Sequence, residues 1–206
     1  MNASTVLTTS AVADRHSRGA NAGIGLWVFM GVATTLFLLF ITAYVMRMNA
    51  SDWSAIAMPW QLWVSTALLL AGSVLLQQAS KAAQGLHWGQ AGSLLLAGGA
   101  CAWVFLGVQL WAWQALYAQH VMPAGNPAAS FFYLLTALHG LHVAGGLVAW
   151  GVITHDFWRR PDPVRDAWRM ALCARYWHFL LAVWALLFAT LGGLTPEVVR
   201  FICGPA

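Results

Sequence analysis

The sequence predicts an all-α fold, an integral membrane bundle of five transmembrane helices, and three observations carry this prediction. Only 8% of the residues are Asp, Glu, Lys or Arg and 60% are hydrophobic, whereas roughly 25% of the residues in a soluble domain are charged. Five apolar segments approach or exceed the roughly 20 residues that a helix needs to cross a bilayer. The connecting segments carry nearly all the charges and most of the prolines.

The first apolar segment, Ile24 to Met46, follows a polar N-terminal tail of residues 1–23. Arg15 and Arg18 stand just before this segment, which is too long for the core of a signal peptide, so we expect an uncleaved first span. The other four spans are expected at residues 60–78, 92–117, 130–154 and 171–194, which makes one membrane domain of residues 24–194 and leaves a C-terminal tail of residues 195–206.

Lys and Arg are distributed unequally between the two sides of this arrangement, which predicts its direction in the membrane. Cytoplasmic loops retain positively charged residues. One side holds only Arg47 and Arg200. The other side holds Arg15, Arg18, Lys81, Arg159, Arg160, Arg165, Arg169 and Arg175. We therefore expect the N-terminus in the cytoplasm and the C-terminus outside a bacterial inner (plasma) membrane.

The charge and cysteine content exclude several other classes of protein. The formal net charge of +4 does not indicate a nucleic-acid partner, because the basic residues lie in connecting segments and form no basic face. The three cysteines, Cys101, Cys173 and Cys203, form no CxxC or Cys/His cluster. Neither a zinc site nor a disulfide framework is therefore expected.

Tryptophan is abundant, with 13 residues, and most of them stand near the ends of the predicted spans. An aromatic belt of this kind is expected at a membrane interface. Trp27, Trp103 and Trp184 stand deeper, where packing between helices is the expected role. Small residues four apart predict close helix contacts in the third and fourth spans, at Gly98 with Ala102 and at Gly140 with Ala144.

Polar side chains within the spans are few, and no Asp or Glu stands in the hydrophobic part of any span. Proton relays and cation sites in membranes usually need a carboxylate. This composition argues against a free-standing transporter, which stays the alternative from a different class, together with a membrane haem protein.

His139 and His142 stand three residues apart in the fourth span and so share one helix face. Two axial haem ligands must approach opposite faces of a porphyrin, which this pair alone cannot do. A haem or divalent-metal site would need His178 from the fifth span, with Gln109 and Tyr176 among its surroundings. The interpretation that we favour is that the histidines are neutral and join helices by hydrogen bonds.

The fifth span begins with a group of polar and aromatic residues, Arg175, Tyr176, Trp177 and His178. We expect Arg175 to reach lipid phosphate and the two aromatic residues to occupy the headgroup zone. His178 lies deeper, and its partner is expected to be a neighbouring helix or a lipid.

The chain resembles subunit III of the haem-copper respiratory oxidases, the family of cytochrome c and quinol oxidases. The similar residues occur in every span and in the right order: "GLWVFMGVATTLFLLFITAY", "LWVSTALLLAGS", "FLGVQLW", "FFYLLTALHGLHVAGG" and "YWHFLLAVWALLF". Family members of this length lack the first two of seven helices, which fits a chain of five spans that starts in the cytoplasm.

The resemblance implies a non-catalytic accessory subunit with no catalytic centre and no redox centre of its own, because haem and copper belong to the partner subunit I. It also implies packing on subunit I, next to subunit II, binding of membrane phospholipid, and support of assembly and sustained turnover. The residues that the resemblance and the span analysis assign to lipid or helix contacts are Trp27, Gln109, His139, His142, Arg175, Tyr176, Trp177 and His178.

The chain departs from the family pattern at three positions, where Ala33, Ala112 and Leu181 stand in place of acidic residues. This difference implies a divergent branch, such as the subunit-III-like protein of nitric oxide reductases. Losing a buried acid together with its partners leaves no orphaned charge, so the replacement is physically coherent.

Overall fold

The computed structural model describes residues 3–48, 53, 54, 56, 58–123 and 125–194, with side chains from residue 21 on. The predicted C-terminal tail, with Arg200 and Cys203, lies outside the described residues. The described chain forms five helices: α1 (Ala3–Arg47), α2 (Gln61–Gln84), α3 (Trp88–Ala118), α4 (Pro127–Arg159) and α5 (Pro163–Gly193). Each contains a segment long and apolar enough to cross a membrane, which confirms the predicted all-α fold.

Helices α4 and α5 begin before the predicted spans, which start at residues 130 and 171, because local capping sets their first turn. The Asn126 side chain accepts a hydrogen bond from the Ala128 backbone N–H at 3.0 Å, ahead of Pro127 at the start of α4. The Asp162 side chain accepts from the Arg165 backbone N–H at 3.2 Å, ahead of Pro163 at the start of α5. Both follow the preference for Asn or Asp at the N-cap and proline in the first turn.

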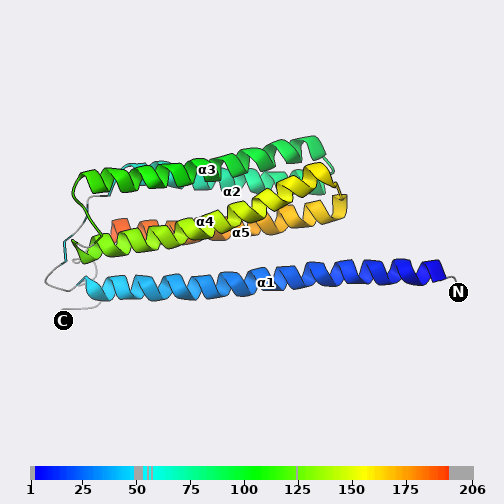
Figure 1. Ribbon diagram of the computed structural model, residues 1–206, viewed down its shortest axis with the longest axis horizontal. Helices are drawn as coiled ribbons and strands as arrows, with labels where there is room; N and C mark the ends of the chain where they lie inside the picture. The colour runs from blue at the N-terminus through cyan, green and yellow to red at the C-terminus, as the bar shows by residue number, and fades with distance from the viewer. Residues whose placement is uncertain (1–2, 49–52, 55, 57, 124, 195–206) are drawn as a thin grey trace.

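Helices α2 to α5 form a bundle, and α1 lies along one side of it (Figure 1). In the bundle α2 packs against α3 and α5, and α4 packs against α3 and α5. The first helix packs mainly against α4 and α5, and its N-terminal part extends past the end of the bundle (Figure 1). The largest group of buried apolar side chains lies mainly between α2, α3, α4 and α5 and includes Met30 of α1.

Small residues permit the closest helix approaches, as the sequence predicts for the third span. A Cβ atom added to Gly98 would lie 2.6 Å from Leu76 Cγ, so α2 and α3 meet there at short distance. The corresponding prediction for Gly140 is wrong, because an added Cβ would meet only Leu106 Cδ2, at 4.0 Å. The close approach on α4 occurs at Gly146, whose added Cβ would lie 2.9 Å from Tyr176 Cε1.

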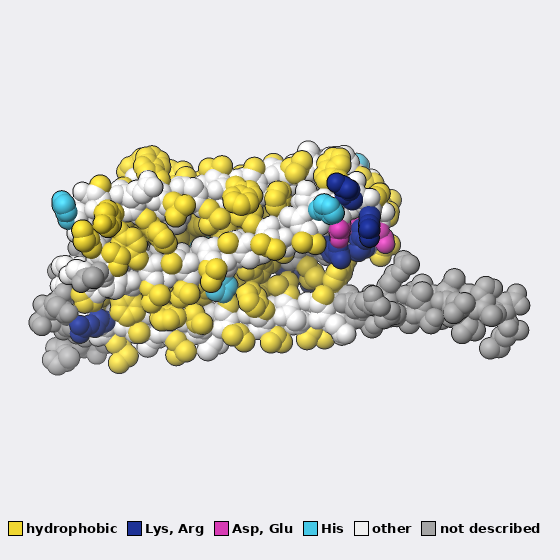
Figure 2. Space-filling model, viewed as in Figure 1, with side chains coloured by type: hydrophobic (Ala, Val, Ile, Leu, Met, Phe, Trp, Pro, Cys, Tyr) yellow, Lys and Arg dark blue, Asp and Glu magenta, His cyan; other side chains and the backbone are white. Residues whose placement is uncertain are grey.

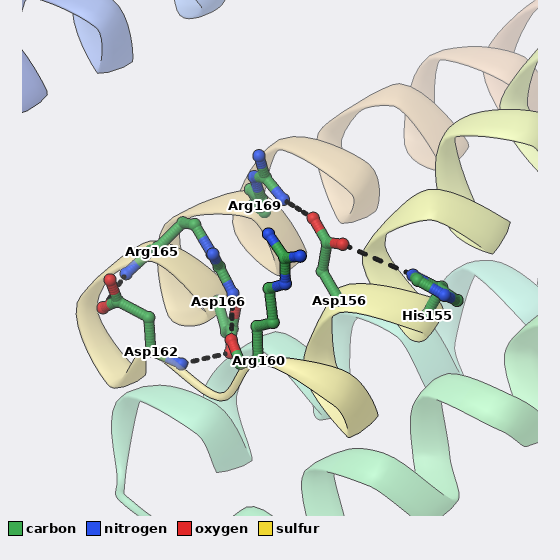
Figure 3. Close-up of polar contacts among 7 residues, drawn as sticks. All are labelled: His155, Asp156, Arg160, Asp162, Arg165, Asp166 and Arg169. Carbon is green, nitrogen blue, oxygen red and sulfur yellow. Dashed lines mark hydrogen bonds and ion pairs between the residues drawn. The ribbon is translucent and has the colours of Figure 1, made fainter.

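Charged side chains gather at the end of the bundle that carries the α4–α5 connection, while hydrophobic side chains cover most of the face in view (Figure 2). Ion pairs and capping bonds order this connection (Figure 3). Asp166, with 3% of its side chain exposed, accepts from the Asp162 backbone N–H at 2.9 Å and from Arg165 Nε at 3.1 Å. Arg169 Nη1 pairs with Asp156 Oδ2 at 2.6 Å across the connection.

Replacing Asp166 by alanine is expected to lower the free energy of unfolding by about 1 to 3 kcal/mol, because two partly buried donors lose a charged acceptor. The control is Asp156→Ala, whose side chain is 27% exposed, and the loss expected there is at most about 1 kcal/mol. Circular dichroism during detergent-driven unfolding measures both. Equal losses in the two variants would show that burial of the Asp166 carboxylate does not increase its contribution to stability.

Candidate functional site

His139 occupies the centre of the bundle, with no exposed surface. Its ring lies among aromatic rings of three other helices, with centroids 6.4 Å from Phe37, 5.9 Å from Phe105 and 5.1 Å from Trp184. Neither ring nitrogen has a hydrogen-bond partner among the described residues. The predicted hydrogen bond from this ring to another helix is therefore wrong, and the ring contributes packing between α1, α3, α4 and α5.

His142 joins helices in a different way from the one predicted. Its Nδ1 donates to the Leu138 carbonyl of its own helix at 2.7 Å. Its ring contacts Phe29 and Phe37 of α1, at centroid distances of 5.8 and 5.3 Å. The hydrogen bond between helices goes to its backbone instead, because Tyr176 of α5 donates to the His142 carbonyl at 2.9 Å.

The ring of His178 forms hydrogen bonds between helices, and its partners lie on α2. The Ser73 hydroxyl lies 2.5 Å from His178 Nδ1. His178 Nε2 lies 3.1 Å from Gln77 Oε1. Because an amide oxygen can only accept, Nε2 carries the proton, and Nδ1 accepts from the serine of α2. Of the two partners expected for this residue, a helix or a lipid, the structure provides the helix.

Replacing His178 or His139 by leucine distinguishes a ring that is hydrogen-bonded to another helix from a buried ring without a hydrogen-bond partner among the described residues. We expect His178→Leu to lower the free energy of unfolding by about 1 to 2 kcal/mol, because two bonds between helices are lost. We expect His139→Leu to raise it by about 1 kcal/mol, because a buried and unpaired polar ring is replaced by an apolar side chain of similar size. Circular dichroism of both purified variants tests this, and a loss at His139 as large as that at His178 would contradict the packing role.

The structure does not bring the three histidines around one point, as the alternative of a haem or metal site requires. The His178 ring is bound to α2 at the surface of the bundle, while His139 lies in its centre. Within the described part of the chain, no group of three or more His, Cys, Asp or Glu side chains is placed to hold a metal ion.

Gln109 of α3 is buried and links its helix to α2, since its Oε1 accepts from the Ser65 hydroxyl at 3.3 Å. Tryptophan N–H groups form similar links, which the sequence did not indicate. Trp113 donates to Thr136 Oγ1 at 3.1 Å, and Trp150 donates to the Leu95 carbonyl at 2.8 Å. Trp113 stands near the end of a predicted span, so its position in the sequence indicated an interface belt rather than a helix contact.

Several expectations for aromatic residues are wrong within this chain. Trp27 and Trp103 are 64% and 60% exposed instead of packed between helices, whereas Trp184 is 2% exposed as expected. Tyr176 and Trp177 are buried in helix contacts instead of lying open to headgroups. The faces on which these residues lie follow from how each helix is rotated, and an evenly apolar span does not specify that rotation.

Arg175 is exposed, as its expected contact with lipid phosphate requires. Two of the three positions where the resemblance implies an acidic residue lie inside, since Ala33 is 4% exposed and Ala112 is fully buried. Ala33 lies one turn from both Phe29 and Phe37, the residues whose rings contact His142. The part of α1 that faces His139 and His142 is therefore apolar.

Comparisons with known proteins point to one family, although no protein-family model matches the chain. The cytochrome bo(3) ubiquinol oxidase subunit 3 of Pseudomonas aeruginosa is 29% identical over 182 residues, covering 84% of this chain and 85% of that protein. The cytochrome c oxidase subunit 3 of Bacillus subtilis is 28% identical over 179 residues, covering 82% and 84%. The probable quinol oxidase subunit 3 of Staphylococcus aureus is 23% identical over 192 residues, covering 87% and 92%.

Proposed function

Since the chain belongs to the family of subunit III of the haem-copper cytochrome c and quinol oxidases, we propose that it is a non-catalytic accessory subunit of such an oxidase. In this role it packs on the large subunit that holds haem and copper, binds membrane phospholipid, and supports assembly and sustained turnover. The observation that carries the proposal is the similarity to oxidase subunits over more than four-fifths of both chains.

The described side chains support a scaffold role rather than chemistry in this chain. The polar groups of the proposed contact set join helices: Gln109 joins α3 to α2, Tyr176 joins α5 to α4, and His178 joins α5 to α2. Large apolar side chains on the outside, Trp27 among them, provide surface for lipid and for a larger partner. Residues 24–194 act as one membrane domain in this proposal.

We also propose that the end of the bundle with the α2–α3 and α4–α5 connections faces the cytoplasm. The described basic residues Lys81, Arg159, Arg160, Arg165 and Arg169 belong to this end, whereas Arg47 ends α1 at the other. This distribution agrees with the preference of cytoplasmic loops for Lys and Arg. Single-cysteine variants His87→Cys and His120→Cys, labelled in intact cells, test this orientation in the membrane. Only the His120→Cys variant should react with an impermeant thiol reagent.

Co-purification tests the proposed function. A tagged copy of this chain, expressed from its own genome, should retain a large subunit with a haem absorption spectrum, while the chain expressed alone should show no Soret band. Deleting the chain should lower the amount of assembled oxidase or shorten its active lifetime during turnover. Haem absorbance in the isolated chain, or an intact oxidase with full sustained turnover after the deletion, would overturn the proposal.

A further inference from the structure

A line of polar side chains follows the contact between α2 and α5, and we call it the α2–α5 seam: Ser73, Gln77 and Lys81 of α2 with Arg175 and His178 of α5. The three α2 residues are spaced four apart and so lie along one face of their helix. His178 contacts Ser73 at 2.5 Å and Gln77 at 3.1 Å. These bonds fix how the two helices are aligned along the seam.

The alignment places two cations at the same level of the seam. Contacts of Trp63 with Phe188, Thr66 with Trp184, and Gln77 with His178 show that α2 and α5 run antiparallel. Lys81 therefore lies one turn beyond Gln77, and Arg175 lies nearly one turn beyond His178, in the same direction. One turn is about 5.4 Å, so both long side chains can reach a common point at this end of the seam.

Lys81 and Arg175 are both exposed, and neither has an ion-pair partner among the residues that the structure describes. Two other cations at this end do have acidic partners, since Arg165 pairs with Asp166 and Arg169 pairs with Asp156. The two seam cations thus offer an anion an uncompensated positive charge beside the last turn of α2.

The neighbouring surface is suited to acyl chains. Val74 and Leu70 of α2, on the membrane side of Lys81, are 45% and 53% exposed. A guanidinium binds phosphate oxygens through two N–H groups, and an ammonium adds a point charge. Basic residues at the edge of a membrane helix attract anionic lipid. A ligand with a phosphate head and hydrocarbon chains matches both the cationic part of this surface, Lys81 and Arg175, and its apolar part, Val74 and Leu70.

We propose that this end of the α2–α5 seam binds an anionic phospholipid, whose phosphate contacts Lys81 and Arg175 while an acyl chain covers Val74 and Leu70. The inference adds a lipid class and a binding position to the lipid binding within the proposed function, and it rests on that function only for the membrane setting. An acidic side chain of a partner subunit is the competing occupant.

Native mass spectrometry of the purified complex, titrated with phosphatidylglycerol or phosphatidylcholine, tests this inference. We expect the double variant Lys81→Gln, Arg175→Gln to bind phosphatidylglycerol about thirtyfold more weakly than the natural chain, the loss expected for two cations that contact a lipid phosphate. Binding of phosphatidylcholine should not change. The variant Lys81→Arg keeps the charge and should retain the preference for phosphatidylglycerol.

Arg159→Gln is the matched control, because Arg159 is an exposed cation at the same end of the bundle but on α4. An equal loss in this control would attribute the effect to overall surface charge and overturn the inference. So would a complex without preference for phosphatidylglycerol, or a chemical cross-link between Lys81 and an acid of another subunit. The same titration on the isolated full chain keeps the lipid result separate from a failure of co-purification.

Discussion

Replacing Trp184 by alanine is expected to lower the free energy of unfolding by about 3 to 5 kcal/mol, the range for removing a large buried aromatic side chain. The residue is 2% exposed and contacts three other helices. Its N–H donates to Thr66 Oγ1 of α2 at 2.9 Å. Its ring centroid lies 5.3 Å from Phe105 of α3 and 5.1 Å from His139 of α4.

The physical reason for so large an effect is that lipid offers no replacement for these contacts. Hydrocarbon tails are as apolar as leucine, so packing and hydrogen bonds, rather than expulsion of water, hold membrane helices together. Alanine would leave a cavity where α2 to α5 meet, and would also remove the bond to Thr66. The His139 ring would lose its nearest aromatic neighbour.

Trp103→Ala provides the control for Trp184→Ala, because Trp103 is 60% exposed on α3. A change within about 0.5 kcal/mol is expected there, as for an outward-facing residue away from packed features. Unfolding of both variants in detergent is followed by circular dichroism, because fluorescence changes with each tryptophan removed. Similar losses in the two variants would contradict the arrangement of the core.

Adding a methyl group at Gly99 is expected to lower the free energy of unfolding by the second-largest amount, after the loss of the Trp184 side chain. A Cβ atom at this position would lie 2.1 Å from Cε2 and 2.6 Å from Nε1 of Trp150. The indole is rigid and also donates to the Leu95 carbonyl one turn away, at 2.8 Å. Gly99→Ala must therefore displace Trp150 and break the bond that joins α4 to α3.

The expected loss for Gly99→Ala is about 2 to 4 kcal/mol, which combines overpacking with one lost bond between helices. Gly107→Ala is the matched control on the same helix, because an added Cβ there meets nothing within 4 Å. Alanine is the better helix former by about 0.8 to 1.0 kcal/mol, so the control should be neutral or stabilised. Opposite changes in unfolding free energy are expected, and two losses of similar size would refute the close approach at Gly99.

The candidate contact residues could be chosen from the sequence, but their partners could not. His139 and His178 both stand in apolar spans and belong to motifs of one family. The first has no hydrogen-bond partner among the described residues, and the second has two on α2. The partners lie 101 and 105 residues away along the chain from His178, so nothing near it in the sequence identifies them.

The sequence by itself determined the properties that depend on local composition. Long apolar segments with few charges must cross a membrane as helices, because a bilayer leaves unpaired backbone groups no other partner. Asn126 with Pro127, and Asp162 with Pro163, start two helices for equally local reasons, although the predicted spans began later, at residues 130 and 171.

Only the tertiary structure decided which face of each helix is buried. In a soluble protein the apolar face of a helix is the buried face, and it can be recognised from the spacing of the apolar residues. Here the lipid and the core are equally apolar, so the sequence of a span has no clear hydrophobic period that would show how the helix is rotated. Trp27 and Trp103 therefore lie outside, Trp184 lies inside, and α5 places Tyr176 against α4 but His178 against α2. Close packing between helices that are far apart in the sequence decides which of these side chains are buried and which helix each one contacts.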